Sequence, residues 1–148
     1  MTEAGIPVYL DANVFIFALE GDPLFGAASA TLLRAVEAGT IAAVTSELTL
    51  AEVLVKPLKL GRGDLVDRFL AAIGEGPIAV HPLSRAILLR SAEIRAAHGG
   101  RLADALDVAT AIEAGCERFV SEDRGIRPPP GLSLVPVADV GAPKVPHP

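Results

Sequence analysis

Short apolar runs alternate along this chain with longer segments in which apolar residues recur at helical spacing. Five apolar runs predict strands, at residues 7–10, 41–44, 78–80, 118–121 and 132–135. The helical spacing predicts helices at residues 14–19, 27–37, 48–55, 65–73, 84–97 and 102–114. Strands that alternate with helices in this way are typical of an α/β fold with a parallel sheet. Because the strands are almost continuously apolar, we expect helices on both faces of the sheet.

Polar and turn-forming residues predict several of the helix boundaries. Ser46 is a good N-cap for the helix at 48–55, and Pro57 is expected to weaken or end that helix. Asp64 follows a glycine-containing loop and is expected to cap the next helix.

The composition fits one domain that folds without disulfides or a structural metal. Of the 148 residues, 51% are hydrophobic, which excludes a mainly disordered chain. Only 4% are aromatic, so we expect an aliphatic core, and the single cysteine, Cys116, is expected to be a small buried apolar residue. We expect a single domain over 1–148, with its core at about 7–136 and a loosely held, proline-rich tail at 137–148.

The charge and hydropathy pattern restricts the partners and the location. A net charge of −5 argues against broad electrostatic adhesion to nucleic acid, but not against an enzyme that acts on nucleic acid through bound cations. No apolar run approaches the roughly 18 residues that span a bilayer, and no signal-peptide pattern opens the chain. We therefore expect a soluble, cytoplasmic protein with no membrane partner.

Acidic residues occur where the predicted sheet would place a ligand. Asp11 directly follows the first strand and Asp123 follows the fourth, so both fall at the carboxyl edge of the sheet, where ligands of α/β folds gather. Glu52 lies in a helical segment with almost no other polarity, where a carboxylate is rarely buried without a partner. Asp104 and Asp107 are three residues apart and share one face of a helix.

Each acid also has a purely structural interpretation. Asp11 can cap the helix that follows it, and Asp123 can be a solvated turn residue. Asp104 can stabilise the N-terminus of its helix through the helix dipole. Together, however, several carboxylates at one edge would repel one another and raise one another's pKa. Oxygen ligands favour Mg²⁺ or Mn²⁺ over zinc as the neutralising ion, and such ions are suited to phosphodiester hydrolysis.

Other chemistry-bearing patterns are weak. Thr45 and Ser46 close the second predicted strand and serve either the site or helix capping. The sequence has no phosphate-binding glycine loop of the Gly-x-x-x-x-Gly-Lys-Ser/Thr type, no dinucleotide-binding Gly-x-Gly-x-x-Gly after the first strand, and no Gly-x-Ser-x-Gly nucleophile turn.

Four segments in order resemble a known family. They are YLDANVFI at 9–16, TSELTLAEVL at 45–54, LADALDVAT at 102–110 and FVSEDR at 119–124. Together they resemble the PIN-domain ribonucleases, and within that group the VapC toxins of toxin–antitoxin pairs, over nearly the whole chain.

The resemblance implies a three-layer α/β/α fold with a central parallel sheet and Mg²⁺- or Mn²⁺-dependent cleavage of RNA. Asp11, Glu52, Asp104 and Asp123 match the acidic quartet that binds metal and carries catalysis in this family. Asn13 matches a position where a small polar residue supports the first aspartate.

Two positions depart from the family pattern. Asp107 stands where a histidine is common in these toxins, and either adds a metal ligand or has no role. Glu122 stands where a neutral residue often precedes the last aspartate, so either Glu122 or Asp123 reaches the metal, and we favour Asp123.

The resemblance also implies partners. PIN toxins form homodimers and are blocked by a small antitoxin, so we expect an endoribonuclease toxin of a type II toxin–antitoxin system with RNA as its substrate. Two alternatives remain open from the sequence: a solitary PIN nuclease of RNA processing, and a non-catalytic PIN module that binds RNA or protein.

Overall fold

Five parallel strands form one sheet in the computed structural model, which describes residues 5–140. The strands are β1 (Val8–Leu10), β2 (Ala43–Ser46), β3 (Ala79–His81), β4 (Arg118–Val120) and β5 (Ser133–Val135). Their order in the sheet is β3-β2-β1-β4-β5. The chain moves outward from β1 through β2 to β3 and then returns to the other side of β1. The order therefore reverses between β1 and β4, where open α/β sheets bind ligands.

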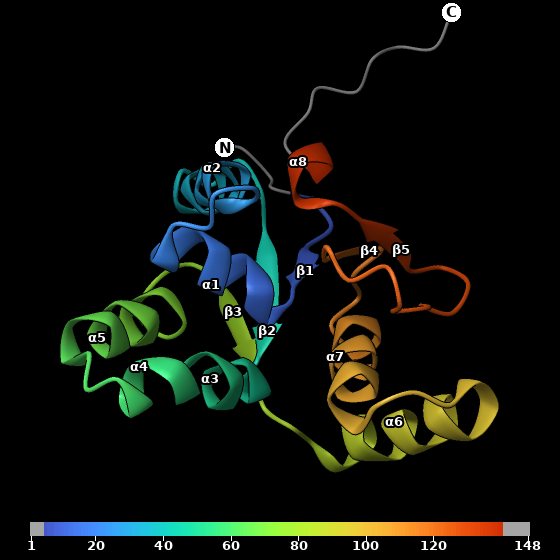
Figure 1. The fold of residues 1–148 in the computed structure, drawn as a ribbon. Helices are drawn as coiled ribbons and strands as arrows, with labels where there is room; N and C mark the ends of the chain where they lie inside the picture. The colour runs from blue at the N-terminus through green and yellow to red at the C-terminus, as the bar shows by residue number, and fades with distance from the viewer. Residues whose placement is uncertain (1–4, 141–148) are drawn as a thin grey trace, which may run out of the picture.

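Helices cover both faces of this sheet, which confirms the predicted three-layer α/β/α fold (Figure 1). One layer contains α1 (Ala12–Glu20), α2 (Gly26–Glu37), α3 (Glu47–Val53), α4 (Val55–Lys59) and α5 (Gly63–Ala72). The other contains α6 (Arg85–His98) and α7 (Leu102–Glu113), and the short α8 (Val137–Val140) packs against α2. No helix among residues 5–140 has both the length and the hydropathy that a membrane span requires.

Successive side chains of a strand point to opposite faces of the sheet, so the buried core has one part on each face. Val8 and Leu10 face a cluster that includes side chains of α1, α2 and α5. Tyr9 faces the opposite cluster with Val108 of α7, and its ring stacks on Phe119 at a centroid distance of 4.9 Å. The core is mostly aliphatic as predicted, but its largest fully buried side chains are aromatic.

Cys116 is confirmed as a buried residue of the cluster around Tyr9 and Val108. Burial raises the pKa of its thiol to about 11.

Some predicted boundaries differ from the structure. The second strand begins at Ala43 and includes Thr45 and Ser46, because Thr45 pairs in register with Val80 and Ser46 with His81. Ser46 does cap α3 as predicted, and its Oγ accepts the N–H of Leu48 at 3.0 Å.

Two predicted helix signals act differently in the structure. Pro57 does not end a helix; the break comes at Leu54, and Pro57 lies in the first turn of α4, where a missing N–H needs no acceptor. Asp64 does not cap α5, because that helix begins at Gly63. Instead, Arg62 forms an ion pair with Asp64 at 2.9 Å and lowers the pKa of that carboxyl to about 2.

The C-terminal segment corrects the predicted core boundary at residue 136. Val137 and Val140 of α8 are buried against the layer that contains α2. The N–H of Val137 also donates to Oε1 of Glu122 at 2.8 Å. The packed part of the chain therefore reaches residue 140, and the rest of the predicted tail, 141–148, lies outside the described residues.

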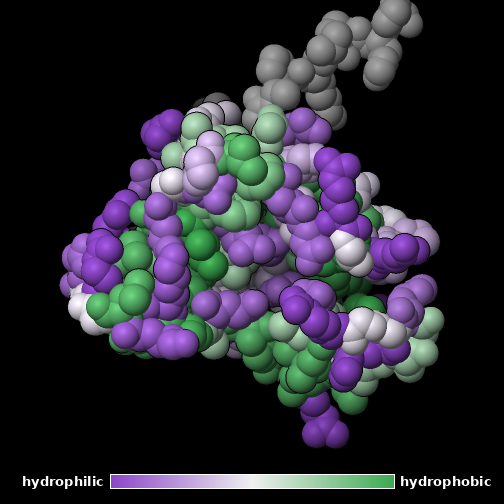
Figure 2. Space-filling view, in the orientation of Figure 1, coloured by the Kyte–Doolittle hydropathy of each residue, from purple (hydrophilic) through white to green (hydrophobic). Residues whose placement is uncertain are grey.

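Exposed apolar side chains gather on a few helices. Figure 2 shows hydrophobic surface over α3 to α5 and near the start of α6, with hydrophilic surface between these areas. Leu58 of α4 and Leu88 and Leu89 of α6 are each about half exposed or more.

Candidate active site

Asp11 lies at the carboxyl end of β1, next to the point where the strand order reverses. It is 6% exposed and is the N-cap of α1, with its carboxylate accepting the N–H of Val14 at 3.3 Å. Burial raises its pKa to about 6. The Ser121 hydroxyl and the N–H groups of Val14 and Asn13 lower the pKa and so limit this rise. The charge of Glu52 raises it further. Capping and a place in the acidic cluster are therefore compatible roles for Asp11.

Glu52 of α3 and Asp104 in the first turn of α7 approach the same edge from the two helical layers. Glu52 is exposed, although the segment around it is mostly apolar. Its pKa is nevertheless raised, first by partial loss of hydration and then by the charge of Asp104. Arg101 opposes this rise, and its Nε lies 3.4 Å from Oδ2 of Asp104.

Asp107 is buried beneath these acids on α7, with 5% of its surface exposed. The Tyr9 hydroxyl donates to its Oδ1 at 2.5 Å. Burial is the main reason that the pKa of Asp107 rises to about 8; the Tyr9 hydrogen bond lowers it, and the charges of Glu52, Asp11 and Asp104 raise it. Asp107 is therefore electrostatically part of the site, with Tyr9 as a partner that the sequence interpretation did not include.

The segment after β4 holds Asp123 and Glu122 in different environments. Asp123 is exposed, and its Oδ1 accepts the N–H of Gly125 at 2.9 Å. Its own N–H donates to the Ser121 hydroxyl at 3.0 Å. That hydroxyl also lowers the pKa of Asp11. Glu122 instead accepts the N–H of Val137.

The structure thus brings together Asp11, Glu52, Asp104 and Asp107, whose charges act on one another. Asp123 lies next to this group, because the Ser121 hydroxyl that accepts its N–H also lowers the pKa of Asp11. Ser121 was not singled out from the sequence. Its place directly after a buried strand and two residues before Asp123 is the signal that marks it.

The smaller polar residues that were predicted to support the site mostly support the backbone. The side chain of Asn13 is exposed, and its N–H faces the Asp11 carboxylate. Thr45 is fully buried, donates to the carbonyl of Leu10 at 2.8 Å and lies 2.7 Å from the Thr49 hydroxyl. Thr45 therefore anchors the end of β1 directly before Asp11.

The donor chemistry of this edge fits a hard divalent cation. The converging groups are carboxylates, which Mg²⁺ and Mn²⁺ prefer, and the charges of neighbouring acids add to the rise that burial causes in the pKa of Asp11 and Asp107. Between residues 5 and 140, however, no three His, Cys, Asp or Glu side chains are arranged closely enough to share one ion. Like charges keep carboxylates apart unless a cation lies between them.

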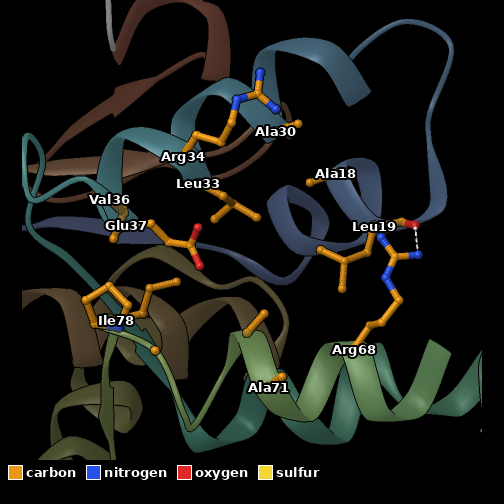
Figure 3. A pocket seen from close by; sticks show the side chains of 13 residues that line it. Ala18, Leu19, Ala30, Leu33, Arg34, Val36, Glu37, Arg68, Ala71 and Ile78 are labelled. Atoms are coloured by element: carbon orange, nitrogen blue, oxygen red, sulfur yellow. Dashed lines mark hydrogen bonds between the residues drawn. The ribbon is translucent and has the colours of Figure 1, made fainter. Parts of the chain in front are cut away.

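One cavity lies away from these acids. It has a volume of about 440 Å³ and is lined by residues of α1, α2, α5 and the segment before β3 (Figure 3). Leu19, Leu33 and Ile78 contribute apolar lining, and Glu37 and Arg68 contribute charge. A smaller cavity of about 170 Å³ borders Asp104.

A doubly covered parallel sheet with acids at the point where strand order reverses defines a class of α/β proteins suited to cation and phosphate chemistry. The family model of the PIN domain matches residues 8–130. The chain belongs to the PIN-domain family.

Solved structures share this fold at low sequence identity. A toxin–antitoxin complex from Klebsiella pneumoniae is 22% identical with a TM-score of 0.64, over 86% of this chain and 95% of that chain. VapBC2 from Rickettsia felis, bound to a DNA fragment from its promoter, is 18% identical with a TM-score of 0.65, over 88% and 98%. VapC20 from Mycobacterium tuberculosis, described as a toxin that cleaves the sarcin–ricin loop, is 12% identical with a TM-score of 0.64, over 76% and 86%. No curated protein matches the chain.

Proposed function

We propose that this protein is a Mg²⁺- or Mn²⁺-dependent endoribonuclease and the toxin of a type II toxin–antitoxin pair. The observation that carries the proposal is the mutual charge coupling of Asp11, Glu52 and Asp104 at the carboxyl edge of the sheet, in a chain of the PIN-domain family. The fold that it shares with solved toxin–antitoxin proteins supports the second part.

The residues have distinct roles in this proposal. Asp11, Glu52 and Asp104 hold the cation, and Asp123 completes the set or orients the attacking water. The chemistry that Mg²⁺ or Mn²⁺ supplies when bound is activation of water and stabilisation of charge at phosphorus. The hydrogen bond from the Val14 N–H at the start of α1 fixes the Asp11 carboxylate in place. Because Glu122 is engaged by Val137, Asp123 is the better candidate of the two acids.

Replacement of Asp11 by Asn tests the catalytic assignment. The purified chain should cleave total cellular RNA at defined sites with Mg²⁺ or Mn²⁺, and EDTA should abolish cleavage. Loss even of groups that support metal ligands typically costs 10- to 100-fold, so Asp11→Asn should lower the rate by about 100-fold or more. Asp67→Asn, at an exposed position of α5, is the matched control. Undiminished metal-dependent cleavage by a folded Asp11→Asn variant would refute the assignment.

The proposed partner is a small antitoxin. The cavity between α1, α2 and α5 offers a place for an apolar segment of such a protein, since Leu19 and Leu33 point into it (Figure 3). Arg68 at its edge bonds the carbonyl of Leu19 at 3.4 Å, which leaves its other N–H groups to meet an acidic side chain of the partner. Leu33→Glu should weaken the complex and leave RNA cleavage unchanged.

The encoding locus supplies a second test of the pairing. A gene for a small DNA-binding protein directly upstream, whose product co-purifies with this chain and inhibits it, is the expected result. Free activity with no such neighbour would instead favour a solitary nuclease of RNA processing. We further propose a homodimer, with light scattering as its measurement; a monomer at all concentrations would overturn that part alone.

A further inference from the structure

A second cavity adjoins the acidic site on the side of α6 and α7. It has a volume of about 170 Å³ and lies between the end of α6, the first turns of α7 and the segment after β4. Asp104 and Arg101 belong both to this cavity and to the acidic site. A ligand bound here would therefore extend directly to the carboxylates.

The lining combines two arginines and a histidine with an apolar floor. His98, Arg101 and Arg127 come from three different segments and are all exposed. Beneath them lie Val108 and Ile126, which are 3% and 8% exposed. The chain carries a net charge of −5, yet basic groups gather at this cavity, directly beside the acidic cluster.

The backbone leaves this cavity open to a chain-like ligand. Gly100 has a φ of 93° in the link between α6 and α7, and a Cβ built there would meet no atom within 4 Å. A nucleic-acid backbone can therefore approach the protein main chain at this point. The volume is below the range of about 300–1,000 Å³ that encloses drug-sized ligands, so the cavity takes a group of about the size of one base and leaves the sugar and phosphate at its rim.

We propose that this cavity is the subsite for the nucleotide next to the cleaved bond of single-stranded RNA. Arg101 and Arg127 contact the phosphate that flanks the cleaved one, and the floor of Val108 and Ile126 contacts the base. Phosphate contacts of this kind position the strand, and an unstacked base is accessible only in single-stranded RNA. The inference rests on the proposed ribonuclease function, because it places the RNA relative to the acids.

Arg127→Ala is the decisive variant. Arg127 is exposed, and among residues 5–140 it forms no ion pair, so its replacement leaves the acids and the packing intact. The control is Arg85→Ala, which removes the same charge from the opposite end of α6, about 20 Å away along the helix.

The measurement is binding of a fluorescein-labelled, ten-nucleotide single-stranded RNA of random sequence, by anisotropy in EDTA between 50 and 200 mM salt. Arg127→Ala should raise Kd at least fivefold and lower the slope of log K against log salt by about 0.7. Arg127→Lys should recover part of the loss, and Arg85→Ala should match the parent chain. An RNA that carries 4-thiouridine should cross-link within residues 94–108 or 125–127.

Equal effects of Arg127→Ala and Arg85→Ala, no measurable binding by the parent chain, or cross-links confined to other segments would overturn the subsite. The failures of the two proposals are distinguishable. If Arg127 governs binding but no RNA is cleaved with Mg²⁺ or Mn²⁺, the cavity stands as an RNA-binding site, and both the nuclease assignment and the place of the cavity beside a cleaved bond fall. If cleavage proceeds with the same KM in Arg127→Ala, the nuclease assignment stands and the subsite falls.

Discussion

Replacing Asp107 by Asn should stabilise the metal-free protein at neutral pH. The Asp107 carboxyl is buried and accepts a hydrogen bond from the Tyr9 hydroxyl. Burial raises its pKa from 3.8 to about 8, so at pH 7 it is protonated in the folded chain and ionised in the unfolded chain. Asparagine has nearly the same shape, keeps an oxygen for Tyr9 and carries no charge at any pH.

The size of the effect follows from proton linkage. Folding takes up a proton at Asp107 between the unfolded pKa of 3.8 and the folded pKa of about 8. The stability contribution of this group is therefore fully present below about pH 4 and is lost as pH rises to about 8, by roughly 1.4 kcal/mol per pH unit. At pH 7 the loss amounts to about 4 kcal/mol. The extra amide N–H of asparagine costs about 1–2 kcal/mol if it lacks a partner, which leaves a net gain of about 2–3 kcal/mol.

Urea unfolding followed by circular dichroism, in EDTA at pH 4 to 8, measures this difference. For a chain of this size, the gain corresponds to about 5–10 °C in melting temperature. Asp67→Asn, an exposed control, should leave the free energy of unfolding nearly unchanged at every pH. Asp11 titrates both in the parent chain and in the Asp107→Asn variant, so its own contribution largely cancels from the comparison.

The pH dependence of the difference is the critical result. At pH 4 the variant should be less stable than the parent chain by about 1 kcal/mol, because of its amide N–H, and it should overtake the parent chain as the pH rises to 8. A constant difference across this range, or a variant that is less stable at pH 7, would show that Asp107 is ionised in the folded chain and would refute the reasoning.

Three further predictions concern the cation, the C-terminal helix and the cysteine. Mn²⁺ at 100 times its Kd should stabilise the parent chain by about 2.7 kcal/mol in urea unfolding and Asp11→Asn by much less; equal stabilisation would place the cation elsewhere. A chain that ends after Pro136 should lose about 3 kcal/mol of stability, because Val137 and Val140 are buried, whereas a chain that ends after Val140 keeps both; equal urea midpoints would contradict this. Cys116, buried and with its thiol pKa raised to about 11, should react with a thiol reagent at pH 8 only as fast as the chain unfolds, and rapid labelling of the folded chain would contradict its burial.

Much of the fold could be predicted from the sequence because its strands are short, apolar and buried on both faces. The boundary of β2 was missed because Thr45 and Ser46 are polar, although both are fully buried. Their hydroxyls find partners in the Leu10 carbonyl and the Leu48 N–H, which no hydropathy pattern reports. Helix α8 was missed because four residues give too short a periodic signal, and its stability comes from packing.

The sequence predicted the position of a site residue where that residue directly follows a strand. It did not predict the environment of residues whose position depends on how a helix packs against the sheet. Asp11 follows β1 directly, so its place at the carboxyl edge depends only on the order of the strands. The exposure of Glu52 depends on which face of α3 turns outward, and the apolar residues beside it in sequence gave the opposite indication. The contact between Tyr9 and Asp107 joins residues 98 positions apart. Its one local signal is a tyrosine in a buried strand, whose hydroxyl requires a partner.

The difference between the two buried acids determines the charge of the site. Asp11 and Asp107 are almost equally buried, yet the pKa of Asp11 rises to about 6 and that of Asp107 to about 8. The Ser121 hydroxyl and two N–H groups at the positive end of α1 lower the pKa of Asp11, whereas only the Tyr9 hydroxyl lowers that of Asp107, which faces three neighbouring acids. At pH 7 Asp11 is therefore mostly ionised and Asp107 mostly protonated. Asp107 then adds little to the negative charge borne by the carboxylates above it, and the Tyr9 hydroxyl holds it in a fixed position behind them.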